Sequence, residues 1–515
     1  MFWKSTLNLL LKYKRNCELI RKTHCWISPQ GFKTEINVYN CATRRKEPLI
    51  LKNKDRITWY TCGPTVYDSS HIGHASCYVK LDIIQRILKD YFKYDIISCL
   101  NITDIDDKII RRANELGVDI NELTEKYEKE FLSDLEKLGI AEPSIIMKVT
   151  QNMRLIISFI EKLIEDDRAY IATDKSVYFN VNSIKKYGKL QNLGNQDEIN
   201  KLSTIKKSSL DFALWKAIKE DGEPFWDSPW GRGRPGWHVE CSALASSIFG
   251  ENIDIHAGGI DLRFPHHENE EAQSCAFHNS EQWVNYWIHT GHLQLNKTEK
   301  MSKSLKNTIS IQDMLQKTLA DVFRMSCIMS RYEHNMEYSE KLMSTAKNNY
   351  DYFKNFINSC NEFKDGFLKA TINEDIIKQL INRSKNNIHN ALCDNFDTPS
   401  VIKVLNELAS TTNSMLYSST SSSGKNGVVS VLSVRNFVTN ILEMFGLNLN
   451  NSIRVSNDSS NIIDILSEFR KEVRTIGLAN KNENLLKLCD NVRSKAKDCG
   501  VTFKDHGKVS SWSLK

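Results

Sequence analysis

Two short motifs carry side chains that could bind phosphate groups. The first, His71-Ile72-Gly73-His74, follows a β-rich run at residues 56–61 and precedes an apolar-periodic stretch at residues 78–88. This order predicts a strand, a glycine-containing turn and a helix, with the motif at the helix N-terminus, where backbone N–H groups and the helix dipole favour phosphate. His71 and His74 share one face and can donate hydrogen bonds to phosphate oxygens, while Gly73 lets a nucleotide approach the backbone.

The second motif, Lys300-Met301-Ser302-Lys303-Ser304, lies well downstream. We expect a loop in which Lys300 and Lys303 close over phosphate groups and stabilise a transition state. Alone, either motif could be an ordinary helix start or basic loop. Together, and in this order, they predict a site that binds phosphate groups.

Four further residues are candidate zinc ligands: Cys62, Cys241, His266 and Glu270. His266 and Glu270 are four residues apart on an expected helix, so both can point at one metal, and two cysteines complete a four-ligand set. The set contains no Cys-x-x-Cys pair. By spacing alone, a buried structural histidine and two core cysteines are the better interpretation.

The motif pair resembles the signature of the class I aminoacyl-tRNA synthetases, and further runs resemble the cysteinyl-tRNA synthetases among them. These runs are Phe264-Pro265-His266-His267-Glu268-Asn269-Glu270 and the segments 101–108, 211–216 and 228–238. The resemblance extends from about residue 38 to 307 and resumes more loosely at 394–399.

This resemblance implies that Cys62, Cys241, His266 and Glu270 bind Zn²⁺, which would hold the thiolate of the substrate. It also implies that Gly63, Thr103 and His266 line a cysteine pocket with Trp237 and His256 beside it, and that Lys303 contacts ATP. Serine differs from cysteine by one atom, and an apolar pocket separates such small differences by only ~10–200-fold. Zinc prefers sulfur, so the ligand set would explain selectivity.

The implied reaction has two steps: L-cysteine and ATP form cysteinyl adenylate, and the acyl group then passes to the 3′ end of cysteine tRNA. Some members of the family also make cysteine persulfide with pyridoxal phosphate, which is linked to a Lys-Ile-Ile-Lys motif and to the lysines of the second signature. Here the first motif reads Lys108-Ile109-Ile110-Arg111, so Arg111 cannot form a Schiff base but Lys108 can.

Three alternatives remain at this stage. The chain could be an ATP-dependent cysteine ligase of the same fold that acts on an amine; the helical patterns after residue 340 argue against this. It could be an RNA-binding paralogue without catalysis, which the intact His71, His74 and Lys303 disfavour. The zinc set could also be purely structural.

The first 34 residues differ from the rest of the chain. They hold seven Lys or Arg and one acid, Glu18, and apolar residues share a helical face among the basic ones. This composition favours a mitochondrial transit peptide over a secretory signal or a solvated tail. Without these residues the chain has 62 basic and 62 acidic residues, so RNA binding must depend on local basic patches.

The remaining composition indicates a reduced compartment, because the thirteen cysteines are odd in number and scattered. No apolar run approaches the ~18 residues of a membrane span. We therefore expect a monomer of the mitochondrial matrix with no membrane contact.

The fold class expected is α/β: a class I Rossmann-like catalytic domain split by an insertion, followed by an α-helical anticodon-binding region. The expected boundaries are 1–34 for the transit peptide, 35–145 and 236–340 for the two halves of the catalytic domain, 146–235 for the insertion, 341–450 for the anticodon-binding domain, and 451–515 for a linker and a small helical tail.

Overall fold

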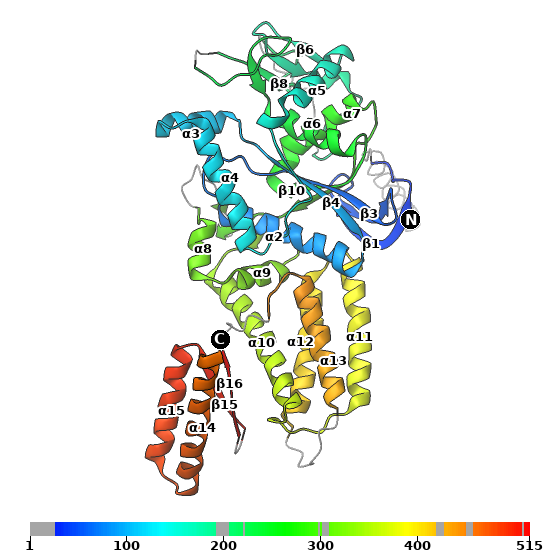
Figure 1. The fold of residues 1–515 in the computed structure, drawn as a ribbon. Coiled ribbons are helices and arrows are strands. Elements are labelled where there is room, and N and C mark those ends of the chain that lie inside the picture. Colours follow the sequence, from blue (N-terminus) through cyan, green and yellow to red (C-terminus); the bar gives the residue numbers. More distant parts are fainter. Residues whose placement is uncertain are drawn as a thin grey trace, which may run out of the picture. The chain divides into compact units, whose positions relative to one another are not determined.

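The computed structural model describes residues 26–191, 205–219, 222–296, 299–300, 308–418, 427–449, 457–506 and 509–514. Residues 1–25, which make up most of the expected transit peptide, and Lys303 of the second motif lie outside these ranges. The chain forms two compact units (Figure 1). The first comprises residues 1–320, 330–339 and 393–396, and the second comprises residues 321–329, 340–392 and 397–515.

A five-stranded parallel sheet organises the first unit, with the strand order β11-β10-β3-β4-β5. The strands are β3 (Arg56–Thr61), β4 (Asp95–Ile102), β5 (Ile145–Lys148), β10 (Ile253–Gly259) and β11 (Val284–Thr290). β11 is buried along its whole length and β10 along all but its last residue, as expected for parallel strands covered on both faces. The predicted α/β class with a Rossmann-like sheet is therefore confirmed.

The order of the strands reverses between β3 and β10. The chain runs outward from β3 to β4 and β5, and then returns to place β10 on the other side of β3. Such a switch point leaves a crevice at the carboxyl ends of the two central strands, where α/β proteins bind their ligands. Cys62 directly follows β3, and Gly258 and Gly259 end β10.

Helices α2 and α6 pack against this sheet, α2 against β10 and β11 and α6 against β4. The helices that accompany the sheet are α2 (Ile72–Arg86), α3 (Asp107–Leu116), α4 (Ile120–Lys137), α6 (Trp237–Phe249), α7 (Glu268–Phe277) and α8 (Ile311–Lys317). A wide helical turn at Arg263–His267 leads directly into α7, so His266 lies one turn before Glu270.

Short strands complete the first unit. A hairpin of β1 (Phe32–Asn40) and β2 (Arg45–Leu51) precedes the sheet. After it, β12 (Leu293–Asn296) pairs with β13 (Glu299–Lys300) and, in parallel, with β14 (Met336–Glu337).

The segment between β5 and α6 has a sheet of its own. Four antiparallel strands lie in the order β6-β7-β8-β9 and pack with α5 around a separate apolar core. The elements are α5 (Met153–Glu165), β6 (Ala169–Ile171), β7 (Val177–Phe179), β8 (Phe212–Ala217) and β9 (Gly233–Pro235). This insertion divides the two halves of the parallel sheet in sequence.

The second unit is mainly helical. Its elements are α9 (Ala320–Ile328), α10 (Glu340–Lys364), α11 (Glu374–Cys393), α12 (Thr398–Leu416), α13 (Val428–Met444), α14 (Asn457–Ala479) and α15 (Glu483–Asp498), followed by the hairpin β15 (Val501–His506) and β16 (Val509–Leu514). The buried Arg470 of α14 forms a bidentate ion pair with Asp505 of the hairpin. Among the described helices, none is both long and apolar enough to span a bilayer.

Candidate active site

Four predicted metal ligands converge at the switch point between β3 and β10. One donor atom from each of Cys62, Cys241, His266 and Glu270 lies within 4.8 Å of the others, and all four residues are buried. The Sγ atoms of Cys62 and Cys241 are 3.7 Å apart, and Glu270 Oε1 lies 3.4 Å from Cys62 Sγ and 3.1 Å from His266 Nε2. Two sulfurs, one imidazole nitrogen and one carboxylate oxygen are a donor set that Zn²⁺ binds, so the residues fit this metal.

Two further histidines extend the cluster. Cys62 and Glu270 also form a second candidate set with His256 and His267. His256 Nε2 lies 2.9 Å from Glu270 Oε2, and the ring of His256 stacks on Trp287 with the centroids 4.4 Å apart. Glu270 is therefore shared by both sets, and His256 contacts it directly.

Other histidines orient the ligands from behind. His238 Nδ1 lies 2.9 Å from His266 Nδ1, and His289 Nε2 lies 2.8 Å from His267 Nδ1. Burial lowers the pKa of His266 well below its usual value and that of His238 to about 3. Both rings are therefore neutral at pH 7, and the neutral imidazole is the form that ligates a metal.

A cleft of about 330 Å³ adjoins the metal cluster and joins it to the first motif. Gly63 and Trp237, two of the predicted cysteine-pocket residues, line it together with His71, Gly73 and His74. A Cβ atom on Gly63 would lie 1.6 Å from the carbonyl oxygen of Asn101, so only glycine fits beside this strand. Trp237 stacks on His266, with the ring centroids 4.3 Å apart.

Thr103 lies behind the cleft in a chain of hydrogen bonds. Its hydroxyl donates to Glu240 Oε2 at 3.2 Å and accepts from Asn101 Nδ2 at 3.3 Å, while Asn101 Oδ1 accepts from the N–H of Gly63 at 2.9 Å. Asn101, Thr103 and Glu240 are each 1% exposed. The chain of bonds thus connects two predicted pocket residues to the helix that carries Cys241.

The first motif forms the N-terminus of α2, as its sequence predicts. His71 is the N-cap: its Nδ1 accepts from the N–H of Gly73, and Nδ1 of His74 accepts from the N–H of His71. The two rings stack with centroids 3.9 Å apart. Because Nδ1 accepts in both rings, each neutral ring carries its proton on Nε2, where it can be donated to a phosphate.

The second motif is described only in part. The backbone of Lys300 pairs with Gln294 in the β12–β13 ladder, and Lys303 lies outside the described residues. Downstream, the N–H of Ile72 donates to Ile309 O and the N–H of Ile311 donates to Ser70 O. The chain thus returns from the second motif to the first residues of α2.

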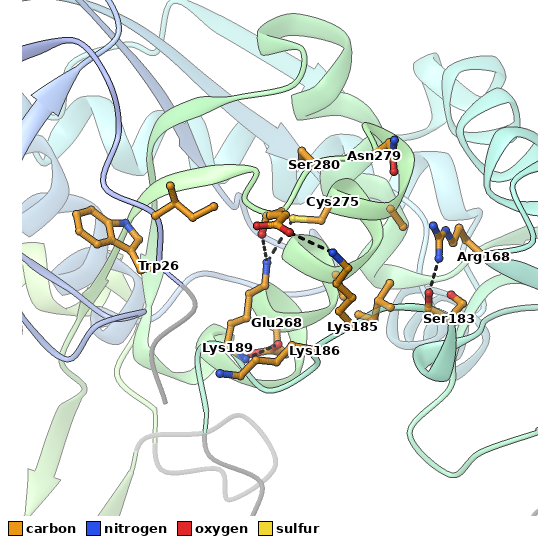
Figure 2. A pocket seen from close by; sticks show the side chains of 15 residues that line it. Trp26, Arg168, Ser183, Lys185, Lys186, Lys189, Glu268, Cys275, Asn279 and Ser280 are labelled. Carbon is orange, nitrogen blue, oxygen red and sulfur yellow. Dashed lines mark hydrogen bonds and ion pairs between the residues drawn. The ribbon is translucent and has the colours of Figure 1, made fainter. Parts of the chain in front are cut away.

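A larger cavity of about 610 Å³ lies on another side of α7 (Figure 2). Lys189 reaches across it to Glu271 Oε1 at 3.0 Å and to Cys275 Sγ at 3.5 Å. The carboxylate of Glu268 accepts the N–H groups of Gly188, Lys189 and Leu190 at 2.7–2.9 Å. The cavity contains none of the predicted site residues, and its buried charges are paired with protein groups.

The structure places four further residues at the site that the sequence motifs did not predict: Asn101, His238, Glu240 and His267. His267 stands beside His266 in the sequence, and that adjacency was the available signal. The sequence contains no comparable signal for Asn101 and Glu240, because their role depends on hydrogen bonds between distant segments.

Comparison with known proteins agrees with this geometry. Residues 49–348 match the family model described as the class I (C) catalytic domain of tRNA synthetases. The fold resembles that of a methionyl-tRNA synthetase from Mycobacterium tuberculosis, with a TM-score of 0.56 and 12% identity over 76% of this chain and 90% of the other. A parallel sheet with the His71–His74 motif at its switch point therefore defines a class I tRNA synthetase.

The relatives found by sequence show to which family within this class the chain belongs. A protein of Xenopus tropicalis named probable cysteine–tRNA ligase, mitochondrial, is 40% identical over 95% of this chain and 91% of its own length. A cysteine–tRNA ligase of Methanococcus aeolicus is 38% identical over 93% of this chain and 99% of its own. The chain belongs to the cysteine–tRNA ligases, which confirms the family and the enzyme class predicted from the sequence.

Proposed function

We propose that this enzyme activates L-cysteine with ATP in the cleft between the metal cluster and α2, and then transfers the cysteinyl group to cysteine tRNA. The observation that carries the proposal is the convergence of Cys62, Cys241, His266 and Glu270 beside a cleft lined by His71 and His74. In this proposal the amino acid side chain binds at the end of the cleft beside the metal cluster, and the nucleotide binds at the end beside His71 and His74.

In the first step, the carboxylate of cysteine attacks the α-phosphorus of ATP and pyrophosphate leaves. His71 and His74 donate hydrogen bonds through their Nε2–H groups to the phosphate oxygens on which charge develops. Lys300 and Lys303 of the second motif stabilise the same charge in this step. ATP enters with Mg²⁺. In the second step, the terminal ribose 2′-OH of the tRNA takes the acyl group and AMP leaves.

The four donors hold Zn²⁺ in this proposal. When bound, zinc would favour a soft sulfur over a hydroxyl and lower the pKa of the thiol. The protein residues do the rest: Trp237 stacks on His266 and fixes its ring, and Gly63 leaves room beside the cluster. Thr103 is held by Asn101 and Glu240, so that its oxygen faces a defined direction.

Cysteine-dependent exchange of pyrophosphate into ATP tests the proposal directly. Wild-type protein should catalyse the exchange with cysteine and far more slowly with serine, and it should charge cysteine tRNA. The variant His74→Ala should reduce the exchange rate by about 10²–10³-fold, the usual cost of one transition-state donor. Absence of exchange in the wild-type protein would contradict the function.

The cellular setting is a second part of the proposal. The basic, acid-poor residues 1–34 and the mitochondrial name of the Xenopus relative support action in the mitochondrial matrix. Residues 1–34 fused to a fluorescent reporter should direct it to mitochondria, and a diffuse cytosolic signal would refute the targeting. We also propose that the enzyme acts as a monomer, which light scattering after gel filtration would test.

The helical unit gives the remaining assignments. We propose that residues 341–450 read the anticodon of the tRNA and that residues 451–515 form an appended tail. A protein that ends at residue 340 should lose tRNA charging.

Lys108 lines the cleft near the rings of Tyr67 and Trp237, and it is the residue that would hold pyridoxal phosphate for persulfide synthesis. Lys108→Arg should abolish any such activity and leave cysteinyl transfer intact.

A further inference from the structure

Lys80 is a buried lysine on the helix that carries the first motif. It lies on α2, six residues after His74, and is 2% exposed. Its Nζ lies 3.5 Å from the carbonyl oxygen of Tyr332 and 3.4 Å from that of His334. Lysine is almost never fully buried because desolvation of the ammonium group is costly, so this position requires an explanation.

The segment that Lys80 contacts forms a scaffold for one wall of the cleft. Tyr332 O accepts the N–H of Gly291 at 2.9 Å, and the N–H of Met336 donates to His292 O at 2.9 Å. The N–H of His292 donates to Asn335 Oδ1 at 3.0 Å. The parallel pairing of β12 with β14 continues this contact.

The packing at this contact leaves little freedom. A Cβ atom on Gly291 would lie 2.2 Å from the backbone of His334, so the two segments touch along their main chains. A displacement of the backbone at residues 332–336 must therefore move residues 291–293 as well. Thr290, Gly291, His292 and Leu293 all line the cleft.

The N-terminal turn of α2, with His71, Gly73 and His74, forms another wall of the same cleft. Lys80 extends from α2 itself. Its side chain thus joins the helix of one wall to the scaffold of the other, through contacts of 3.4 and 3.5 Å between the ammonium group and two main-chain carbonyl oxygens.

We propose that Lys80 is a positioning residue for ATP: it fixes the distance between the two walls of the nucleotide cleft without touching the nucleotide. The inference rests on the proposed function, because it assigns ATP to this cleft. Loss of the ammonium group lets the 332–336 segment move away from α2 and widens the cleft. The cost falls on ATP binding, because the four candidate zinc ligands come from other segments: the end of β3, α6, and the turn and helix at residues 263–277.

Three variants and one control test this. Lys80→Met removes the charge and keeps the length of the side chain, whereas Lys80→Arg keeps both the charge and the donors. Asn335→Ala weakens the same scaffold from an exposed position, so it should fold even where Lys80→Met does not. Lys189→Met removes a half-buried, ion-paired lysine of the same unit that lines the other cavity.

For each protein, the measurements are the KM for ATP and the KM for cysteine in pyrophosphate exchange, the Kd for ATP by calorimetry, and the melting temperature. Lys80→Met and Asn335→Ala should raise the KM and Kd for ATP by about tenfold and change the KM for cysteine less than twofold. Lys80→Arg should stay within about threefold of wild type. Lys189→Met should lower the melting temperature and leave ATP binding unchanged.

The proposal is overturned if Asn335→Ala and any folded Lys80 variant bind ATP as the wild type does. It is also overturned if Lys80→Met raises both KM values in parallel, or only to the extent that Lys189→Met does. If wild-type protein shows no exchange, the proposed function fails, and the calorimetric Kd for ATP still decides the role of Lys80.

Discussion

Glu270 and Glu271 are neighbours on α7, and both carboxylates are buried. Glu271 accepts from Lys189 and from the N–H groups of Trp283 and Val284 at 3.0–3.4 Å. Glu270 instead faces Cys62, His256 and His266, whose nearest atoms are themselves metal donors. A buried carboxylate among protein donors is already compensated, whereas one among other ligand atoms needs a shared proton or a cation.

The two faces of α7 thus have different roles. The face of Glu268 and Glu271 ties α7 to residues 188–190 of the insertion, and this network includes the ion pair between Glu271 and Lys189. Figure 2 shows Lys189 and Glu268 in the larger cavity. The face of His266 and Glu270 belongs to the metal cluster. The size of a cavity therefore does not identify the active site in this protein. The active site is identified by the convergence of several metal-donor atoms that face one another.

The substitution Glu270→Gln should have the largest effect on activity. It removes one metal ligand and a negative charge, so cysteine-dependent exchange should fall by more than about 100-fold, since even residues that only support a metal ligand cost 10–100-fold. Bound zinc, measured by elemental analysis, should fall in parallel. If the variant keeps both its bound zinc and its exchange rate, Glu270 is not a metal ligand.

The matched substitution Glu271→Gln should act on stability instead. It leaves the half-buried ammonium group of Lys189 without its carboxylate partner, which should lower the free energy of unfolding of the first unit in urea by about 1.5–3 kcal/mol, the usual contribution of a hydrogen bond to a charged group. Burial alone lowers the pKa of Lys189, but Glu271 and Cys275 raise it above its usual value. The ion pair between Lys189 and Glu271 therefore contributes its full stabilisation at pH 6–9, and this stabilisation is lost only as the pH rises above about 10.

Zinc content and the KM for cysteine should remain at wild-type values in Glu271→Gln. Loss of zinc from this variant would mean that the two faces of α7 are not separable.

Asp134 of α4 is a buried acid of a third kind, which differs from both glutamates. It is 0% exposed, and neither of its carboxylate oxygens has a hydrogen-bond partner in the part of the chain that the structure describes. Burial and then the charge of Glu130 raise its pKa to about 6. Because the folded pKa exceeds the unfolded one, the charged form is disfavoured, and stability falls as the pH rises from about 4 to 6.

The substitution Asp134→Asn should remove this effect. The variant should be more stable than wild type by about 3 kcal/mol at pH 7.5 and nearly equal in stability near pH 4, as measured by urea unfolding at both values. A loss of stability at pH 7.5 would show that the carboxylate has a partner after all.

Much of the sheet could be predicted from sequence, because β3 and β4 are short apolar runs next to turn residues. The position of His71 and His74 at a helix N-terminus followed from the same local order. The metal ligands could not be predicted by spacing: Cys62 and Glu270 are 208 residues apart and meet only through β3 and α7. They were predicted from the resemblance to a known family.

Other features had no local signal. Lys80 is one basic residue in a helix that is buried on most sides, and its role depends on carbonyl groups more than 250 residues away. The β15–β16 hairpin escaped the sequence analysis because the lysine-containing pattern of the tail indicated helix throughout, whereas Arg470 and Asp505 hold the hairpin to α14. Long-range contacts, not propensity, decide both cases.

The central claim is that four side chains hold a zinc ion that selects cysteine over serine. Its most direct test is to measure, in wild type and Cys241→Ser, the bound zinc per chain together with the ratio of exchange rates for cysteine and serine. The structure predicts about one zinc and a strong preference for cysteine in wild type, with both reduced together in the variant. If zinc content and selectivity both survive the substitution, the cluster does not select the substrate.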